Sequence, residues 1–151
     1  MSNNQQKTLE ELFKERREYW MSWTDRFASM LNDIQNIPTL QSEIYARRQE
    51  AVENRYSLSA AIATKTKEFN VKQSSLYSKL RLMKIPNTPN YMYSSDSAIR
   101  QQIDGELAED KYVIQVIDNH VQFLDETIKT IDEINFSIQN RIRVQEIIIG
   151  K

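Results

Sequence analysis

The chain has 151 residues, of which 40% are hydrophobic and 27% are charged, a composition that favours a packed core and argues against wholesale disorder. Two glycines and three prolines are too few for the many turns of a β-rich or α/β fold. Because there is no cysteine, disulfides and thiolate metal sites are excluded. We therefore predict an all-α protein built from long helices.

The net charge of −1 hides an uneven distribution of charge along the chain. Residues 40–84 contain nine Lys/Arg and four Glu, whereas residues 96–151 contain six Lys/Arg and eleven Asp/Glu. The segment between them, 85–95, carries no charged side chain. The sequence thus has a basic middle and an acidic C-terminal third.

The first predicted helix covers residues 8–36 and follows a polar N-terminal segment, residues 1–7, which we expect to be disordered. Thr8-Leu9-Glu10-Glu11 matches the capping box, in which hydroxyl and carboxylate each accept from a free backbone N–H. Apolar residues then recur at steps of three and four, which is typical of one helical face. Pro38 is predicted to end this helix.

A second, basic helical region is predicted for residues 39–84, which contain neither glycine nor proline. Arg48 and Arg55 stand where its apolar stripe would otherwise continue. Residues 70–75 contain few strong helix formers, so an interruption of the helix there remains open. Two prolines make residues 85–96 a predicted loop.

The last predicted helix, residues 97–151, carries the longest apolar stripe, and Gly105 marks a bend near its start. A stripe of five turns or more is typical of a coiled coil or a long bundle helix. Helices of up to ~70 Å do not fit a compact globule of ~15 Å radius of gyration. We therefore predict an elongated, oligomeric helical bundle or coiled coil, with subunit contacts at Val121, Leu124, Ile128, Ile131, Ile138 and Ile142.

No pattern in the sequence predicts catalysis. His120 is the only histidine, and its place beside the apolar stripe favours a structural or interface role over a catalytic one. Asp104, Glu106, Glu109 and Asp110 form an acidic cluster that fits complementation of a helix dipole better than metal binding. Phosphate-cradling loops need several glycines at fixed spacing, which this chain lacks. We predict a non-enzymatic protein with no cofactor, catalytic residue or metal ligand.

The basic middle allows two interpretations. Clustered cations bind phosphates, and unpaired bases stack on aromatic rings, which favours a nucleic-acid site. The alternative is a solvated helix face whose aromatic residues belong to the core. Under the first interpretation the binding residues are Lys65, Lys67, Lys72, Lys79, Arg81, Lys84, Arg55, Phe69 and Tyr77, with Tyr91 and Tyr93 following in the uncharged loop.

Short motifs in the C-terminal third resemble a known family. They are Val121-x-Phe123-Leu124-Asp125, Ile128-Lys129-x-Ile131, Phe136-x-Ile138-x-Asn140-x-Ile142 and a terminal Gly150. Together with Asp104-x-Glu106 and Ile37-Pro38-x-Leu40, they resemble the UvsY-like recombination mediators of tailed phages. The match covers roughly residues 37–45 and 103–151, less than half of the chain.

The resemblance implies a non-enzymatic protein that forms a ring-like homo-oligomer and binds single-stranded DNA. It further implies that the protein helps a RecA-like recombinase displace single-strand-binding protein. In that family a pair of basic residues one apart contacts DNA, followed by paired tyrosines and a glycine. Lys65-Thr66-Lys67-Glu68-Phe69 is the best counterpart here, without the tyrosine pair and glycine. The alternative function is a structural or adaptor coiled-coil protein with no nucleic-acid role.

The sequence also carries an expectation about location. No apolar run approaches the ~20 residues that span a bilayer, so we expect no membrane partner. A chain without cysteine is compatible with a reducing compartment. We therefore expect a cytoplasmic protein, located in the cytoplasm of an infected bacterial host if a phage encodes it.

Overall fold

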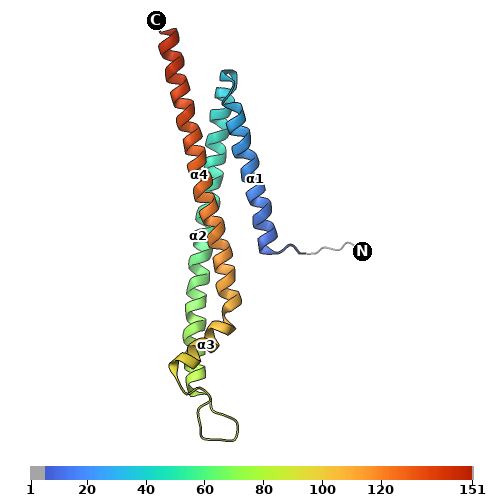
Figure 1. Ribbon diagram of the computed structural model, residues 1–151, viewed down its shortest axis with the longest axis vertical. Helices are drawn as coiled ribbons and strands as arrows, with labels where there is room; N and C mark the ends of the chain where they lie inside the picture. The colour runs from blue at the N-terminus through green and yellow to red at the C-terminus, as the bar shows by residue number, and fades with distance from the viewer. Residues whose placement is uncertain (1–5, 151) are drawn as a thin grey trace, which may run out of the picture. The chain divides into compact units, whose positions relative to one another are not determined.

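A computed structural model describes residues 6–150, and within this range the protein is all-α, as the sequence predicts. The described residues contain no β-strand and one short 3-10 helix, Ile34–Asn36. The α-helices, labelled in Figure 1, are α1 (Leu9–Met30), α2 (Ile37–Leu82), α3 (Asp96–Glu106) and α4 (Ala108–Ile149). The disorder expected for residues 1–7 lies outside the described range apart from Gln6 and Lys7, and so does Lys151.

The predicted start of α1 is correct, and its predicted end is not. The Thr8 hydroxyl accepts a hydrogen bond from the Glu11 N–H at 3.2 Å, and the Glu11 carboxylate accepts from the Thr8 N–H at 3.0 Å. The helix ends at Met30 rather than at residue 36. The reason is local, because the Asp33 carboxylate accepts from the Gln35 N–H at 3.0 Å and so caps a separate 3-10 turn.

Pro38 lies in the first turn of α2 and does not terminate α1. Proline is tolerated there because the first N–H groups of a helix have no intrahelical partner. Residues 70–75 do not interrupt α2, which continues to Leu82. The predicted helix 97–151 is divided into α3 and α4 at Leu107, two residues after Gly105.

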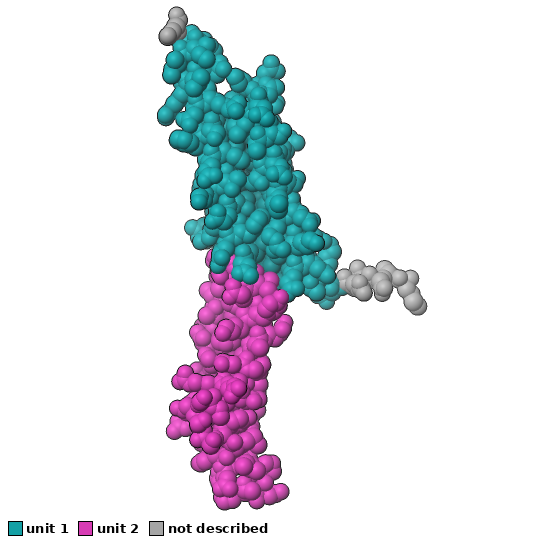
Figure 2. Space-filling view, viewed as in Figure 1, with its two compact units in different colours: residues 1–57, 119–151 teal, residues 58–118 magenta. Residues whose placement is uncertain are grey.

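The chain divides into two compact units, shown in different colours in Figure 2. Unit 1 consists of residues 1–57 and 119–151, and unit 2 of residues 58–118. Unit 1 therefore contains α1, the first part of α2 and the last part of α4, which lie side by side (Figure 1). Unit 2 contains the rest of the two long helices together with α3.

The core of unit 1 is built from buried residues that recur every seven positions. Seven residues make about two turns, so each such series occupies one face of its helix. These faces meet between the three helices of the unit, and their members are at most 8% exposed. The series are Phe13, Trp20 and Phe27 in α1, Ile37, Ile44 and Ala51 in α2, and Leu124, Ile131 and Ile138 in α4.

Unit 2 has a smaller core, located where α3 packs on the end of α2. Its buried residues are Leu80, Ile99, Ile103 and Leu107. The side chains of Phe69, Leu76, Tyr77, Met83 and Tyr93 are half-buried around them. The division between α3 and α4 belongs to this core, because Leu107 at the junction is itself buried.

We predict that Ile131→Ala lowers the free energy of unfolding by about 2–5 kcal/mol. Ile131 has no exposed surface, so truncation removes buried methyl groups and leaves a cavity. Urea unfolding followed by circular dichroism measures the effect. Val71→Ala is the control, because Val71 is 63% exposed, and its effect should stay within about 0.5 kcal/mol. Equal losses in the two variants would contradict this description of the core.

Candidate nucleic-acid interface

The predicted nucleic-acid residues are not all in one unit. Lys65, Lys67, Phe69, Lys72, Tyr77, Lys79, Arg81 and Lys84 belong to unit 2, whereas Arg55 belongs to unit 1. All except Lys84 are in α2, and Lys84 follows directly after the end of that helix. The candidate interface is therefore a property of unit 2, and Arg55 is considered separately.

Several cations of α2 form ion pairs with acidic residues of α4. In unit 1, Arg48 donates to Asp132 at 2.7 Å, and Arg55 forms the equivalent pair with Asp125. The hydrogen bond to Asp125 raises the pKa of Arg55. From the first pair to the second, the position advances seven residues along α2 and goes back seven residues along α4, as it does between antiparallel helices. In unit 2 the Lys72 ammonium lies 3.3 Å from the Asp110 carboxylate.

These ion pairs account for part of the charge segregation that the sequence displays. The acidic residues of α4 neutralise Arg55 and Lys72, two of the predicted binding residues. Each pair is solvent-exposed and contributes only about 0–1 kcal/mol to stability. Their main effect is to set the register of the two helices and to remove two cations from the set free to meet phosphates.

The other predicted cations remain exposed and form no ion pair within the described part of the chain. They are Lys65, Lys67, Lys79, Arg81 and Lys84. They do not form one patch. Lys65 and Lys79 are fourteen residues apart and share a helix face, and Lys67 and Arg81 share another. The structure thus places two rows of cations on different faces of α2.

The row that contains Lys65 and Lys79 has a structural cause. It continues the seven-residue series of α2, in which Ile44 and Ala51 are buried in unit 1. In unit 1 this face of α2 packs in the three-helix core that α1 completes, and α1 is not part of unit 2. In unit 2 the series continues with Leu58, which is half-buried, and then with Lys65, Lys72 and Lys79, which are exposed. Each seven-residue step turns a straight helix by about 20°, so these later positions have moved off the buried side of α2, which Phe69 and Leu80 occupy in unit 2.

The two predicted aromatic residues are packed against the core and do not stand free. Phe69 and Tyr77 lie against the buried cluster of unit 2. The Tyr77 hydroxyl also donates a hydrogen bond of 2.7 Å to Asp96, which raises the pKa of the phenol. For these two side chains the structure agrees with the interpretation that the aromatic residues of the basic segment belong to the core.

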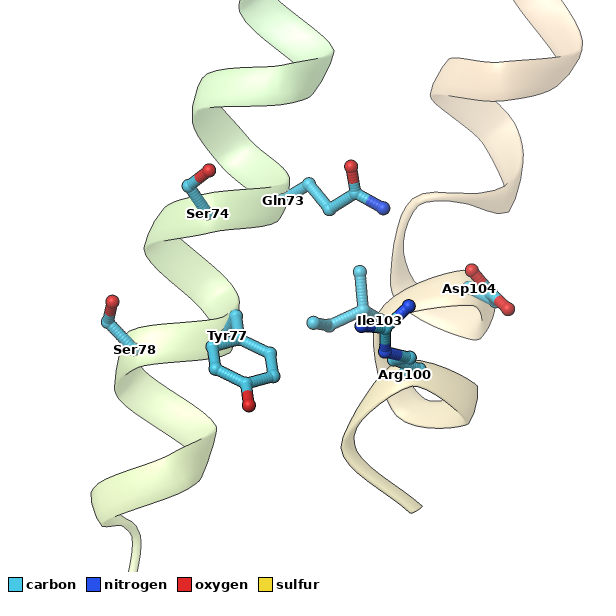
Figure 3. A pocket seen from close by; sticks show the side chains of 7 residues that line it. All are labelled: Gln73, Ser74, Tyr77, Ser78, Arg100, Ile103 and Asp104. Atoms are coloured by element: carbon cyan, nitrogen blue, oxygen red, sulfur yellow. The ribbon is translucent and has the colours of Figure 1, made fainter. Parts of the chain in front are cut away.

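Unit 2 has two neighbouring hollows, the first beside Tyr77 and the second closer to the loop. Figure 3 shows the first, of about 530 Å³, with Gln73 and Tyr77 on α2 facing Arg100, Ile103 and Asp104 of α3. The second, of about 540 Å³, has Ser78 in common with the first, so the two are neighbours. Its other lining residues are Arg81, Leu82, Tyr91, Tyr93, Ser94, Ser95, Asp96 and Ile99.

Sequence reasoning did not assign Tyr91 or Arg100 to the interface. Tyr91 is 56% exposed, and Arg100 is exposed on α3. The signal for Tyr91 was present, since a tyrosine beside prolines in an uncharged loop has little core to join. Arg100 could not have been found, because its approach to α2 depends on how α3 folds back.

The residues predicted for subunit contacts are largely buried within the chain. Val121, Leu124, Ile131 and Ile138 are at most 7% exposed, and Ile128 and Ile142 are half-buried. The unit 1 parts of α1 and α2 cover this stripe. The exposed apolar residues in the unit 1 part of α4 are different ones, which the sequence analysis did not select: Phe136, Val144, Ile147, Ile148 and Ile149.

His120 is a buried residue of unit 1. Its ring stacks on Phe13 with centroids 4.4 Å apart, and on Phe123 at 5.8 Å. Burial, with smaller contributions from the charges of Arg17 and Arg16, lowers its pKa to about 4. The ring is therefore neutral near pH 7 and is enclosed by aromatic side chains, a setting that offers no access to a substrate.

The described residues offer neither a metal-binding group of side chains nor a membrane-spanning helix. Among them, no three His, Cys, Asp or Glu side chains are grouped so that they could hold a metal ion. The acidic cluster around Asp104 and Asp110 does not form such a group. None of the helices in this range combines the length and apolar character needed to cross a bilayer.

No protein-family profile, curated protein or solved structure matches this chain significantly. The geometry narrows the candidate interface to the unpaired cations of unit 2 and the two hollows beside them.

We predict that His120 makes the protein less stable in acid. Its pKa falls from 6.5 in the unfolded chain to about 4 in the fold, so the unfolded state binds the proton first. Stability is retained above pH 6.5 and is lost at up to about 1.4 kcal/mol per pH unit between pH 6.5 and 4. Urea midpoints across this range measure the slope. The slope should be shallower in His120→Leu, and an unchanged slope would contradict the assignment.

Proposed function

We propose that this protein is a non-enzymatic, single-stranded-DNA-binding recombination mediator. In this role it promotes loading of a RecA-like recombinase onto single-stranded DNA in place of single-strand-binding protein. The proposal joins two kinds of support, the C-terminal motifs that resemble UvsY-like mediators and the exposed cations of unit 2. Neither of them requires a catalytic residue, a metal or a cofactor.

The observation that carries the proposal is the set of five exposed cations of unit 2 without ion pairs in the described residues. Lys65, Lys67, Lys79, Arg81 and Lys84 fall within twenty residues, whereas Arg55 and Lys72 are paired with acids. A polyanion gains affinity from unpaired cations because it releases its condensed counterions. A flexible single strand can contact cations on two helix faces, which a stiff duplex does less readily.

We further propose that copies of the chain assemble through the outer face of α4 near its end. Phe136 and Ile147 are each 65% exposed, while Ile138 between them is buried on the inner face. A helix segment that is apolar on both sides is normally covered on both. Assembly then multiplies weak contacts along one strand.

The alternative function, a structural or adaptor protein with no nucleic-acid role, has its own support. The pairs Arg48–Asp132, Arg55–Asp125 and Lys72–Asp110 use the basic middle and the acidic C-terminal third to align α2 with α4. If register were the only task of these charges, the remaining lysines would serve solubility alone. The two functions differ in a single measurement, the binding of an unpaired strand.

We predict salt-sensitive binding of single-stranded oligonucleotides. If the five unpaired cations all meet phosphates, the slope of log affinity against log salt is about −3.5. Changing both Lys65 and Lys67 to Ala removes two contacts and should flatten the slope by about 1.4. Fluorescence anisotropy at several salt concentrations measures both slopes. The alternative function predicts no binding even at about 50 mM salt.

A matched control is the double variant Lys14→Ala with Lys111→Ala, which changes the net charge equally but alters exposed lysines of α1 and α4. Its slope should equal that of the wild type. Arg55→Ala should also bind normally, because the Asp125 carboxylate already engages that guanidinium. If the control variant weakens binding as much as the α2 variant, the interface is not on α2.

We predict that Phe136→Glu combined with Ile147→Glu disrupts self-association without unfolding the chain. Charges placed in a dry interface are disfavoured, and loss of such anchors weakens a complex by roughly 30-fold or more. Analytical ultracentrifugation measures the mass, and circular dichroism confirms the helices. Val71→Glu, at a position 63% exposed on α2, is the control. A wild-type protein that sediments as a monomer at high concentration would refute the proposed assembly.

A further inference from the structure

The segment between α2 and α3 has a fixed conformation rather than that of a loose loop. The Met92 N–H donates to the Met83 carbonyl at 2.8 Å, and the Ile85 N–H donates to the Asn90 carbonyl at 2.9 Å. These bonds bring Lys84 and Tyr91 together as an antiparallel bridge. Pro86 and Pro89 restrict the turn further. Tyr91 is therefore held in place by backbone bonds on both sides of it.

Tyr91 differs from Tyr77 and Tyr93, the nearest tyrosines of unit 2, in that its ring is turned outward. It is 56% exposed, whereas Tyr77 and Tyr93 are half-buried against the core cluster. The Lys84 ammonium lies 5.7 Å from the centroid of the Tyr91 ring. An aromatic side chain fixed at the surface beside a cation has little to contribute to folding. It has the features of a recognition residue, because the cost of ordering it is already met in the free protein.

The surroundings of Tyr91 are suited to a single nucleic-acid strand. The ring and the Arg81 guanidinium line the same groove, of about 540 Å³. The neighbouring hollow, which shares Ser78 with this groove, adds Arg100 (Figure 3). Asp96 is the acidic residue that lines the groove, and the Tyr77 hydroxyl donates to it at 2.7 Å. Its position in the first turn of α3 also sets its charge against the positive end of that helix.

We propose that Tyr91 is a stacking platform for one unpaired base, with Arg81 and Lys84 contacting the phosphates on either side of that base. This inference rests on the proposed function, and it adds a contact with a base to contacts that are otherwise electrostatic. Stacking needs the face of a base and not its hydrogen-bonding edge, so the site accepts any base. Double-stranded DNA is excluded because its bases are already stacked on one another.

The test compares an oligothymidylate of twelve nucleotides with an abasic oligonucleotide of the same length and charge. The wild-type chain should bind the base-containing strand roughly tenfold more tightly. Tyr91→Leu should remove this preference by weakening the oligothymidylate complex alone, whereas Tyr91→Trp should retain it. Arg81→Gln should instead weaken both complexes to a similar degree, because it removes a phosphate contact. Tyr45→Leu is the control, since Tyr45 is a 76% exposed tyrosine of unit 1.

The outcomes separate the two proposals. If Tyr91→Leu binds oligothymidylate as tightly as the wild type does, the stacking platform is refuted while the proposed function stands. A wild-type chain that binds both strands equally well leads to the same conclusion. If the wild type binds neither strand at about 50 mM salt, the proposed function fails and this inference fails with it. Because Tyr91 is exposed, circular dichroism of the Leu variant should match the wild type.

Discussion

The packing of α2 against α4 in antiparallel order is the constraint on which the other features depend. In unit 1, α1 packs with these two helices, and the α2 series that contains Ile44 and the α4 series that contains Leu124 are both buried. In unit 2 only the short helix α3 joins them, so less apolar surface can be covered. α2 accordingly buries Ile44 and Ala51 in unit 1, whereas it exposes Lys65 and Lys79 in unit 2.

The smaller core of unit 2 leaves cations of α2 at the surface. Lys65 and Lys79 are exposed there, so presenting them to a ligand requires no rearrangement. Arg55 illustrates the opposite case, because Asp125 already neutralises it. Charge segregation along the sequence is therefore a mixture of two effects. In the first effect, ion pairs between α2 and α4 align the two helices. In the second, other cations of α2 stay unpaired, and only these are available to bind a polyanion.

The sequence predicts helices well because helix formation here is a local property. Few glycines and prolines and the Thr8 capping box are enough to predict long helices and the start of the first one. It predicts helix ends poorly, since Pro38 can stop one helix or begin another.

Periodicity also shows that Leu124 and Ile131 are buried but not what buries them. A stripe covered by α1 and α2 of the same chain has the same spacing as one covered by a second copy. Tyr91 is visible in the sequence as a tyrosine of the uncharged loop, but its fixed, exposed position depends on backbone bonds of that loop, which the sequence does not show.

The proposed interface combines two interactions that respond differently to salt. Contacts between lysines and phosphates weaken steeply as salt rises, because each released counterion gains less entropy when the surrounding salt is more concentrated. Stacking on Tyr91 is an uncharged contact and persists, so at moderate salt the loop holds a larger share of the strand than α2 does. A mediator has to hold a strand and then surrender it to another protein. Many weak cation contacts spread over assembled copies meet that requirement, since a recombinase can displace them one at a time. In the proposed assembly, the base stacked on Tyr91 of one copy sets the position on the strand at which the neighbouring copy binds. Neither the cations of α2 nor the apolar end of α4 can set that position.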